Sequence, residues 1–298
     1  MSLDVLTLPD LGGARVVVPA PASGPGNWAG AASATLVDDQ VYLAYRVRRP
    51  VGKGRGVSTV VARSSDGLAF EQVCEVFRDD FGAESFERPV VLRRPDGGWR
   101  LYLSCATPGS KHWWIEALDA DRPEDLPTGR RTVVDAGTPE VAVKDPVILV
   151  VDGVWHRWTT EHPLTEAGHE DRMTTAYATS ADGLAWTRHG TVLAPRPGTW
   201  DARGARVTTV LSLEPLVVLY DGRATAEANW FEVTGLARAC LDGVLVPDDA
   251  VAPLRSPHSD GALRYLSAVP LPDGSTRFYA EVARPDGAHD LVTMLSPA

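Results

Sequence analysis

A segment of one kind recurs five times along the chain, and its spacing restricts the architecture more than any other feature of the sequence. Each copy has a short apolar run, a tight polar turn and a second run that carries aromatic side chains; the copies begin at Ala34, Val90, Val147, Val207 and Leu266. Their turns are roughly 57 to 60 residues apart, and repeats of this length that hold several strands are typical of β-propellers. Five such units account for nearly all 298 residues. We therefore expect one all-β domain, residues 1–298, folded as a five-bladed β-propeller.

The second half of each unit reads as another hairpin. Residues 58–77 and 174–193 each contain alternating apolar residues, an Asp-Gly turn and an aromatic residue that begins the next run. Glycine tolerates the positive φ that a tight hairpin needs, so each blade is expected to have four strands. The last unit ends one strand short. We expect residues 5–8 or residues 16–18 to supply that strand and close the ring, which removes two exposed sheet edges.

Composition and motifs exclude several classes of protein. The net charge of −10 argues against nucleic acid as a partner. The chain has no run of 18 apolar residues and no signal-peptide pattern at its start, so we expect neither a membrane span nor secretion. Cys74, Cys105 and Cys240 lie far apart, which is typical of reduced thiols, and we expect a cytoplasmic protein.

Motifs of other catalytic classes are missing from the sequence. It has no GxSxG elbow, no HExxH, no histidines at metal-ligand spacing and no sustained helical periodicity. We expect no cofactor. The basic loop 46–56 lacks the spacing of a phosphate-binding loop. It reads as a solvated hairpin loop or, alternatively, as one wall of a pocket.

Propeller topology brings the starts of the inner strands to one face, together with the loops between the second and third strands. The carboxylates expected there, which we assign to catalysis, are Glu87, Asp145 and Asp201. The side chains expected there that we assign to substrate binding are Asn27, Trp28, Arg88, Trp113, Trp114, Lys144, Glu161, Arg203, Arg206, Trp230 and Arg264.

This set of side chains suits a carbohydrate. Aromatic rings stack on the apolar faces of sugars, and carboxylates and arginines bind hydroxyls or anions in bidentate fashion. Cleavage of a glycosidic bond needs one carboxyl group that protonates the leaving oxygen and a second that activates water or attacks. Glu87 and Asp145, on adjacent inner strands, are the best-placed pair, with Asp201 as a third candidate. Each has a plainer interpretation as a backbone cap or as the partner of an arginine on the next blade.

Two short patterns resemble a known group of enzymes. Inner strands that start with an acidic residue and proline (Glu87-Arg88-Pro89 and Lys144-Asp145-Pro146), together with the SxDGxxF/W hairpins at 64–70 and 180–186, are similar to the five-bladed propeller glycoside hydrolases of families 43, 32 and 130. In families 43 and 32 the resemblance implies acids on the first three inner strands. Here Ala31 or a neighbour stands in the first position and Arg88 in the second, so Asp145 alone is in register.

This departure leaves two explanations open. Glu87, Asp145 and Asp201 share the catalytic work, or the fold binds a glycan without cleaving it. The surplus of cations resembles the phosphorylases of family 130, where phosphate replaces water, and equally suits an acidic sugar. We expect a glycosidase-like hydrolase that acts by inversion on a glycoside or small oligosaccharide, with a binding propeller and a phosphorylase as alternatives. The resemblance also leaves open whether the central channel holds a structural calcium ion.

Overall fold

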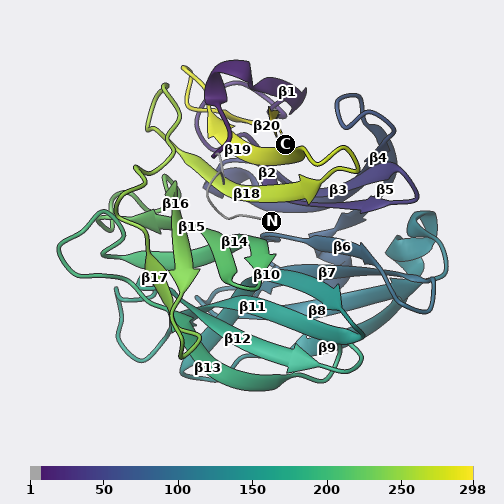
Figure 1. Cartoon of the computed structure of the whole chain (residues 1–298). Helices are drawn as coiled ribbons and strands as arrows, with labels where there is room; N and C mark the ends of the chain where they lie inside the picture. The colour runs from purple at the N-terminus through teal and green to yellow at the C-terminus, as the bar shows by residue number, and fades with distance from the viewer. Residues whose placement is uncertain (1–7, 298) are drawn as a thin grey trace.

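The computed structural model describes residues 8–297 and consists of four-stranded antiparallel blades that follow one another around an axis (Figure 1). Blade 1 contains β2 (Trp28–Val37), β3 (Gln40–Arg48), β4 (Gly56–Ser64) and β5 (Glu71–Phe77). Blade 2 contains β6 (Val90–Arg93), β7 (Trp99–Ala106), β8 (Trp113–Ala120) and β9 (Arg130–Asp135). Blade 3 contains β10 (Val141–Val151), β11 (Val154–Pro163), β12 (Thr174–Ser180) and β13 (Thr187–Leu193). Blade 4 contains β14 (Gly204–Leu213), β15 (Leu216–Arg223), β16 (Val233–Ala239) and β17 (Leu245–Pro247). Blade 5 contains β18 (Leu263–Pro270), β19 (Thr276–Ala283), β20 (His289–Ser296) and β1 (Arg15–Val18).

Short 3-10 helices occupy some of the connections between these strands. They are η2 (Leu11–Gly13), η3 (Val51–Lys53), η4 (Arg78–Phe81) and η5 (Pro123–Thr128). None of the helices in residues 8–297 has the length and apolar character needed to cross a membrane.

The start of the chain closes the ring, as expected from the sequence. Strand β1 pairs antiparallel with β20, with Val16 opposite Val292, and so forms the outer strand of blade 5. The prediction for residues 16–18 is confirmed, whereas residues 5–7 of the alternative lie outside the described part of the chain. A parallel contact between Trp28 and His289 further links blade 1 to blade 5.

The Asp-Gly turns hold neighbouring blades together. In the turn of blade 1, the Ser64 hydroxyl accepts the Gly67 N–H at 2.9 Å, and Asp66 accepts two further backbone N–H groups. Gly67 has φ +70 and leaves room for Tyr279 of blade 5, whose hydroxyl donates to the Gly67 carbonyl at 2.9 Å. Tyr102 of blade 2 binds the equivalent turn of blade 3 at 2.7 Å. The SxDG motif is therefore a joint between blades.

The apolar core lies between the blades. One cluster between blades 1 and 2 contains Tyr42, Trp99 and Leu101, and another between blades 3 and 4 contains Trp158 and Tyr220. Each sheet buries both faces against its neighbours, which is how a propeller removes most of its apolar surface from water.

The inner strands share a local irregularity that shapes the axis. One position per blade, each about one repeat from the next, falls at Ala31, Arg88, Asp145, Thr208 and Tyr265. Ala31, Asp145 and Tyr265 have φ of 54°, 53° and 54°, and the strand pairing shifts at each of them. A side chain on the second strand of the preceding blade accepts the N–H of each of these three residues; the acceptors are Glu281, Ser104 and Asp221. Such a φ costs about 1–2 kcal/mol for a residue other than glycine, and these hydrogen bonds from the neighbouring blade offset that cost. Contacts between blades therefore stabilise the bulges.

We predict that the closing strand contributes to stability through its inner side chains. Val18 packs against the cluster that contains Ala29 and Leu291, whereas Val16 is 54% exposed. Val18→Asp should lower the free energy of unfolding by about 1–2 kcal/mol because it replaces a partly buried apolar contact with a carboxylate. Val16→Asp, the matched control, should change it by about 0.5 kcal/mol or less. Urea unfolding measures both, and equal effects would contradict the observed pairing.

Candidate active site

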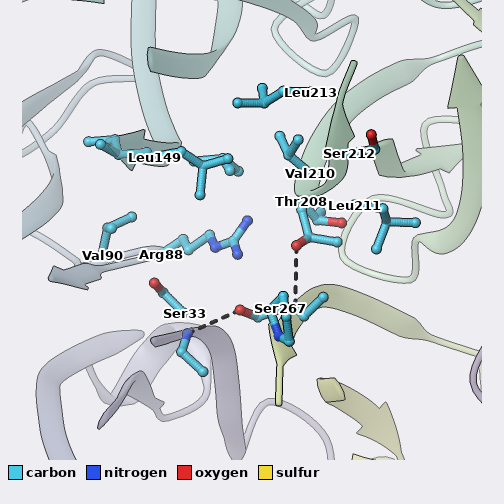
Figure 2. Close-up of a pocket in the computed structure, with 16 residues that line it drawn as sticks. Ser33, Arg88, Val90, Leu149, Thr208, Val210, Leu211, Ser212, Leu213 and Ser267 are labelled. Atoms are coloured by element: carbon cyan, nitrogen blue, oxygen red, sulfur yellow. Dashed lines mark hydrogen bonds between the residues drawn. The ribbon is translucent and has the colours of Figure 1, made fainter. Parts of the chain in front are cut away.

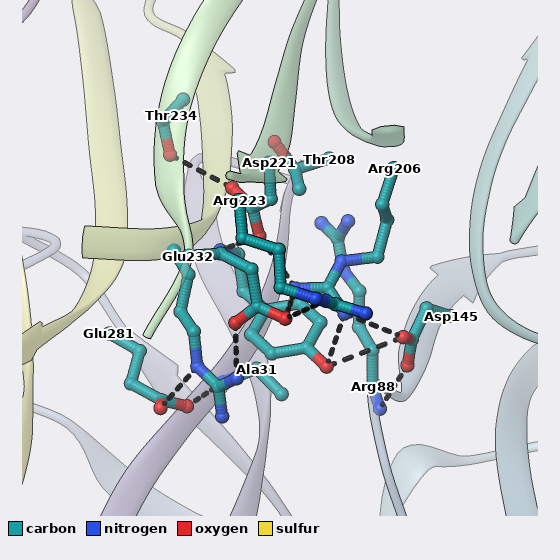
Figure 3. Close-up of polar contacts among 12 residues, drawn as sticks. Ala31, Arg88, Asp145, Arg206, Thr208, Asp221, Arg223, Glu232, Thr234 and Glu281 are labelled. Atoms are coloured by element: carbon teal, nitrogen blue, oxygen red, sulfur yellow. Dashed lines mark hydrogen bonds and ion pairs between the residues drawn. The ribbon is translucent and has the colours of Figure 1, made fainter. Parts of the chain in front are cut away.

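Charged side chains fill the upper end of the axis, where the inner strands begin. Within residues 8–297, a network of ion pairs joins five carboxylates and five cationic groups, which we call the axial ring. Its members are Glu87, Asp145, Asp221, Glu232 and Glu281, with Arg46, Lys144, Arg206, Arg223 and Arg264. All of them are buried except Lys144, whose side chain is 11% exposed. Figure 3 shows part of the ring.

Carboxylate and guanidinium groups alternate along one side of the axial ring. Arg46 pairs with Glu87 and, through Nη2 at 3.0 Å, with Glu281. The second oxygen of Glu281 lies 2.8 Å from Nε of Arg264. Arg264 continues the chain to Glu232, with 2.7 Å between Nη1 and Oε2. Glu281 and Glu232 therefore each have two cationic partners, which offsets the large cost of burying their charges.

The other side of the axial ring centres on Arg206. Its Nη2 lies 2.8 Å from Asp221 and its Nη1 lies 3.1 Å from Asp145. Arg223 pairs with the remaining oxygen of Glu232 at 2.7 Å. The ring carboxylates are thus occupied by cations, and the described residues contain no group of three or more His, Cys, Asp or Glu side chains that could hold a metal ion.

A tyrosine hydroxyl closes the ring and joins the two carboxylates assigned to catalysis. The buried Tyr265 hydroxyl lies 3.0 Å from Oε2 of Glu87 and 3.3 Å from Oδ2 of Asp145, and it accepts a hydrogen bond from Arg206 at 2.9 Å. These two oxygens are no further apart than the sum of those distances, which is shorter than the about 6.5–9.5 Å typical of carboxyl pairs in inverting glycosidases. Tyr265 was not among the predicted site residues. Its equivalence to Asp145 in the repeat was the available signal.

Both of these carboxylates are held in the ionised form. Burial opposes ionisation of Glu87, but Arg46 and Lys144 outweigh burial and lower its pKa. Burial likewise opposes ionisation of Asp145, and Lys144 with Arg206 holds its pKa well below the usual range. In the unliganded protein, neither group is therefore the protonated acid that glycoside cleavage needs.

A small pocket, which we call the upper pocket, opens above the axial ring. Its volume is about 160 Å³, and the residues around it are Arg55, Glu87, Ser110, Lys111, Trp113, Lys144, His162, Glu170, Asp171, Arg223, Asn229 and Trp230. Glu87 is the only carboxylate of the axial ring among them. Lys144 Nζ lies 4.7 Å from the centre of the Trp113 ring, and Trp230 is 36% exposed. Arg55 confirms the alternative in which the basic loop 46–56 forms one wall.

His162 contributes a hydrogen-bond acceptor to the upper pocket. Its Nδ1 lies 2.7 Å from the carbonyl oxygen of Glu170, which assigns the proton to Nδ1 and leaves the lone pair on Nε2. Burial and the charge of Lys144 lower the pKa of His162 to about 3, so the ring is neutral near pH 7. Nε2 is buried and has no partner within the described residues. A sugar hydroxyl is a suitable donor to it.

Glu281 occupies the space beside the blade 1 position that carries no acid. The Ala31 N–H donates to Oε2 of Glu281 at 3.1 Å. A Cβ on the neighbouring Gly30 would lie 1.9 Å from that same oxygen. The carboxylate next to the first inner strand therefore comes from β19, the second strand of blade 5. Sequence reasoning gave no role to Glu281, because only the fold brings it against blade 1.

The structure does not bring Asp201 together with the other two predicted catalytic carboxylates. Asp201 is buried before β14, where it accepts from the Tyr220 hydroxyl at 2.8 Å and pairs with Arg196 at 3.0 Å; Thr199 also donates to it. Within residues 8–297 it has no contact with Glu87 or Asp145. It anchors the entry to blade 4.

Five of the predicted substrate-binding residues lie at the upper pocket or directly below it. Trp113, Lys144 and Trp230 line the pocket. Arg206 and Arg264 belong to the axial ring and hold its carboxylates.

Three more of the predicted residues do not line the upper pocket, although Asp171, the partner of one of them, does. Glu161 forms a bidentate pair with Arg188 at 2.7 and 2.8 Å. Arg203 pairs with Asp171 at 2.8 Å. The Arg88 guanidinium extends to the lower part of the axis, where its Nε donates to a backbone carbonyl.

The last three are packing residues. Trp28 is buried and stacks on His289, with 4.3 Å between ring centres. The Asn27 side chain donates to the carbonyl of Ser23, and the Trp114 indole donates to Glu116 at 3.3 Å. All three residues are near top loops in the sequence, but this position alone does not show which way their side chains point.

Comparison with known proteins confirms the fold resemblance. No family model matches the sequence, and a search of curated proteins finds no match. Among solved structures, β-1,2-mannobiose phosphorylase from Listeria innocua matches with a TM-score of 0.64 and 15% identity, over 98% of this chain and 92% of that one. An α-L-arabinofuranosidase from Lactobacillus brevis matches with a TM-score of 0.64 and 13% identity, over 89% and 90%. A glycosyl hydrolase from Bacteroides ovatus matches with a TM-score of 0.63 and 15% identity, over 98% and 96%. At this level of identity the likeness establishes the five-bladed propeller fold of glycoside hydrolases and phosphorylases.

We predict that the contact between Gly30 and Glu281 is essential to the axial ring. Gly30→Ala should lower the free energy of unfolding by at least about 2 kcal/mol, because the new methyl group displaces a carboxylate bound by two arginines. Gly52→Ala is the matched control: a Cβ there meets no atom within 4 Å, and the change should be about 0.5 kcal/mol or less. Denaturant unfolding compares the two. A Gly30→Ala protein as stable as the control would show that Glu281 is not held in this position.

Proposed function

We propose that this chain is a carbohydrate-active enzyme that transfers a glycosyl group from a small glycoside to inorganic phosphate. The observation that carries the proposal is the position of Glu87. It is the one carboxylate of the axial ring that reaches the upper pocket, and cations surround it there. The other two carboxylates of the pocket have partners outside the axial ring, since Asp171 pairs with Arg203 and Glu170 accepts the Gly168 N–H. One acid with a site for an anionic nucleophile is what phosphorolysis requires, because phosphate needs no second carboxylate to activate it.

The remaining residues of the upper pocket fit the parts of such a substrate. Lys144 and Arg223 lie at the base beside Glu87 and can bind phosphate oxygens. Trp113 and Trp230 provide aromatic surface for a sugar ring. One of the structural neighbours, the Listeria phosphorylase, was solved with β-1,2-mannobiose, and it supports a disaccharide as the class of substrate.

Hydrolysis by Glu87 and Asp145 as an inverting pair fits this geometry less well. Asp145 does not line the upper pocket, and it is bound by the Arg88 N–H, Arg206 and Tyr265. A water molecule activated by Asp145 would need the space that the Tyr265 hydroxyl fills. Phosphate as the attacking group removes the need for that second carboxylate.

In the proposed reaction Glu87 donates the proton that the leaving group needs. Bound phosphate adds negative charge beside Glu87 and raises its pKa, so that Glu87 takes up a proton from solvent; the proton that HPO₄²⁻ carries returns to solvent from the glycosyl phosphate once it has formed. Glu87 passes its proton to the leaving oxygen as the bond between the anomeric carbon and that oxygen breaks. A phosphate oxygen forms the new bond from the opposite face. The products are a glycosyl phosphate and the free alcohol.

A glycan-binding propeller without turnover is the second candidate. It is favoured by the ion pair between Glu87 and Arg46 and by the ionised state of Glu87 in the unliganded protein. A binder would take up the same disaccharides and release no product.

The product of the reaction tests the proposal. Disaccharides incubated with the protein should yield a sugar 1-phosphate only when phosphate is present, observed by phosphorus NMR. Glu87→Gln should lower kcat by about 10²- to 10⁴-fold because it cannot donate the proton, while the exposed Glu71→Gln should be unaffected. Free sugar formed at the same rate without phosphate would indicate hydrolysis, and binding without product would indicate the second candidate; either result overturns the proposal.

Anion binding should be linked to the protonation of Glu87. Sulfate has no titration of its own near neutral pH, so it serves as the probe. Its binding should raise the pKa of Glu87 and draw protons from solution at about pH 5. Calorimetric titrations in buffers of different ionisation enthalpy measure this uptake. The uptake should decrease in Glu87→Gln; an unchanged value would show that the anion binds away from Glu87.

A further inference from the structure

A second cavity, which we call the lower cavity, lies on the axis at the opposite end from the upper pocket (Figure 2). Its volume is about 260 Å³. Its walls come from blades 1 to 5, from inner-strand residues at or beyond the bulges and from the strand ends of β10, β14 and β18. The axial ring separates it from the upper pocket, since Asp145 and Tyr265 lie between the two. The proposed glycosyl transfer makes no use of this cavity.

One cationic side chain projects into the lower cavity without a carboxylate partner. The Arg88 side chain is 2% exposed, and Figure 2 shows its guanidinium pointing into the open centre. Nε donates to the carbonyl of Ala32 at 3.0 Å, but Nη1 has no hydrogen-bond partner, and Arg88 has no ion pair within residues 8–297. Burial lowers the pKa of Arg88 to about 10 against the attraction of Asp145 and Asp221, so the group stays charged at neutral pH.

Nearby hydroxyl groups are also available as donors. Ser267 Oγ accepts the Ala34 N–H at 3.0 Å, and Thr209 Oγ1 accepts the Ala268 N–H at 3.2 Å. Both hydroxyls line the lower cavity and already use an oxygen lone pair, so their protons remain free to donate to a ligand. A buried guanidinium with two hydroxyl donors is complementary to an anion.

The rest of the wall decides which anion fits. Aliphatic side chains, including Val147, Leu149 and Val210, cover much of the surface. A dianion would bring one uncompensated charge into this apolar space, whereas a monoanion is neutralised by Arg88. The volume is several times the roughly 30 Å³ of one water molecule, which leaves room for a chain of roughly four to six carbon atoms.

We propose that the lower cavity is a binding site for a short-chain monocarboxylate, with the carboxylate on Arg88 and the hydrocarbon chain against the aliphatic wall. The planar guanidinium binds both carboxylate oxygens, and the Ser267 and Thr209 hydroxyls complete the site. This site is separate from the upper pocket and does not depend on the function proposed for it.

Hexanoate is the probe that tests the proposal. Calorimetry on the full-length protein should detect hexanoate, with 1-hexanol at least ten-fold weaker because it lacks the charge. Arg88→Met should weaken hexanoate at least ten-fold. Arg93→Met replaces an exposed arginine at the end of β6, the strand that follows Arg88; it is the matched control and should bind as the wild type does.

Two further measurements keep the test decisive. Lys111→Met alters the upper pocket and should leave hexanoate binding unchanged; loss of binding in this variant with retention in Arg88→Met would place the ligand in the wrong cavity and overturn the proposal. If Arg88→Met does not fold, NMR on the wild type decides, because hexanoate should show NOEs to methyl groups of Val147 and Leu149. Binding of hexanol equal to that of hexanoate, or no binding of either, would also overturn it.

Discussion

The alternation of carboxylates and guanidiniums around the axis is the constraint on which this propeller depends. Buried charges are costly unless each has close partners of opposite sign, and here Glu281, Glu232 and Arg206 each have two or more. The partners come from different blades, so the ring forms only when the blades stand in the correct order and register. Apolar packing between sheets would tolerate small slips, whereas a displaced carboxylate would be left unpaired. The ring therefore gives the repeat architecture a single arrangement.

The same ring also orders the backbone at the axis. Glu281 and Asp221 accept N–H groups from the bulges at Ala31 and Tyr265, and Ser104 does the same at Asp145. Side chains of second strands thus stabilise the left-handed backbone conformation of one residue in each of these inner strands. The resulting layer of charge lies between an upper pocket, which one carboxylate of the ring reaches, and a lower cavity, into which the Arg88 side chain projects without an ion pair among the described residues.

This division gives a physical reason for the unusual distribution of acids. The ring carboxylates from second strands and top loops, such as Glu281 and Glu232, are fully occupied by arginines. Glu87 differs because it is the carboxylate of the ring that also lines the upper pocket. The absence of an acid at Ala31 does not leave a gap, since Glu281 lies against it.

Repeat spacing and turn chemistry were enough to predict the blades, their four strands and a closing strand near the start of the chain, because hairpins depend on residues close together in the chain. The choice between residues 5–8 and 16–18 for that strand came from the structure. The same reasoning placed Glu87 and Asp145 near one another, but it could not assign directions to individual side chains. Glu87 and Arg88 are neighbours in the chain, yet they face opposite ends of the axis. Asp201 turns to Tyr220, and Tyr265 bridges two carboxylates from other blades. Local sequence therefore accounts for the propeller, whereas the site emerges only in three dimensions, since its charges are stabilised by partners from distant blades.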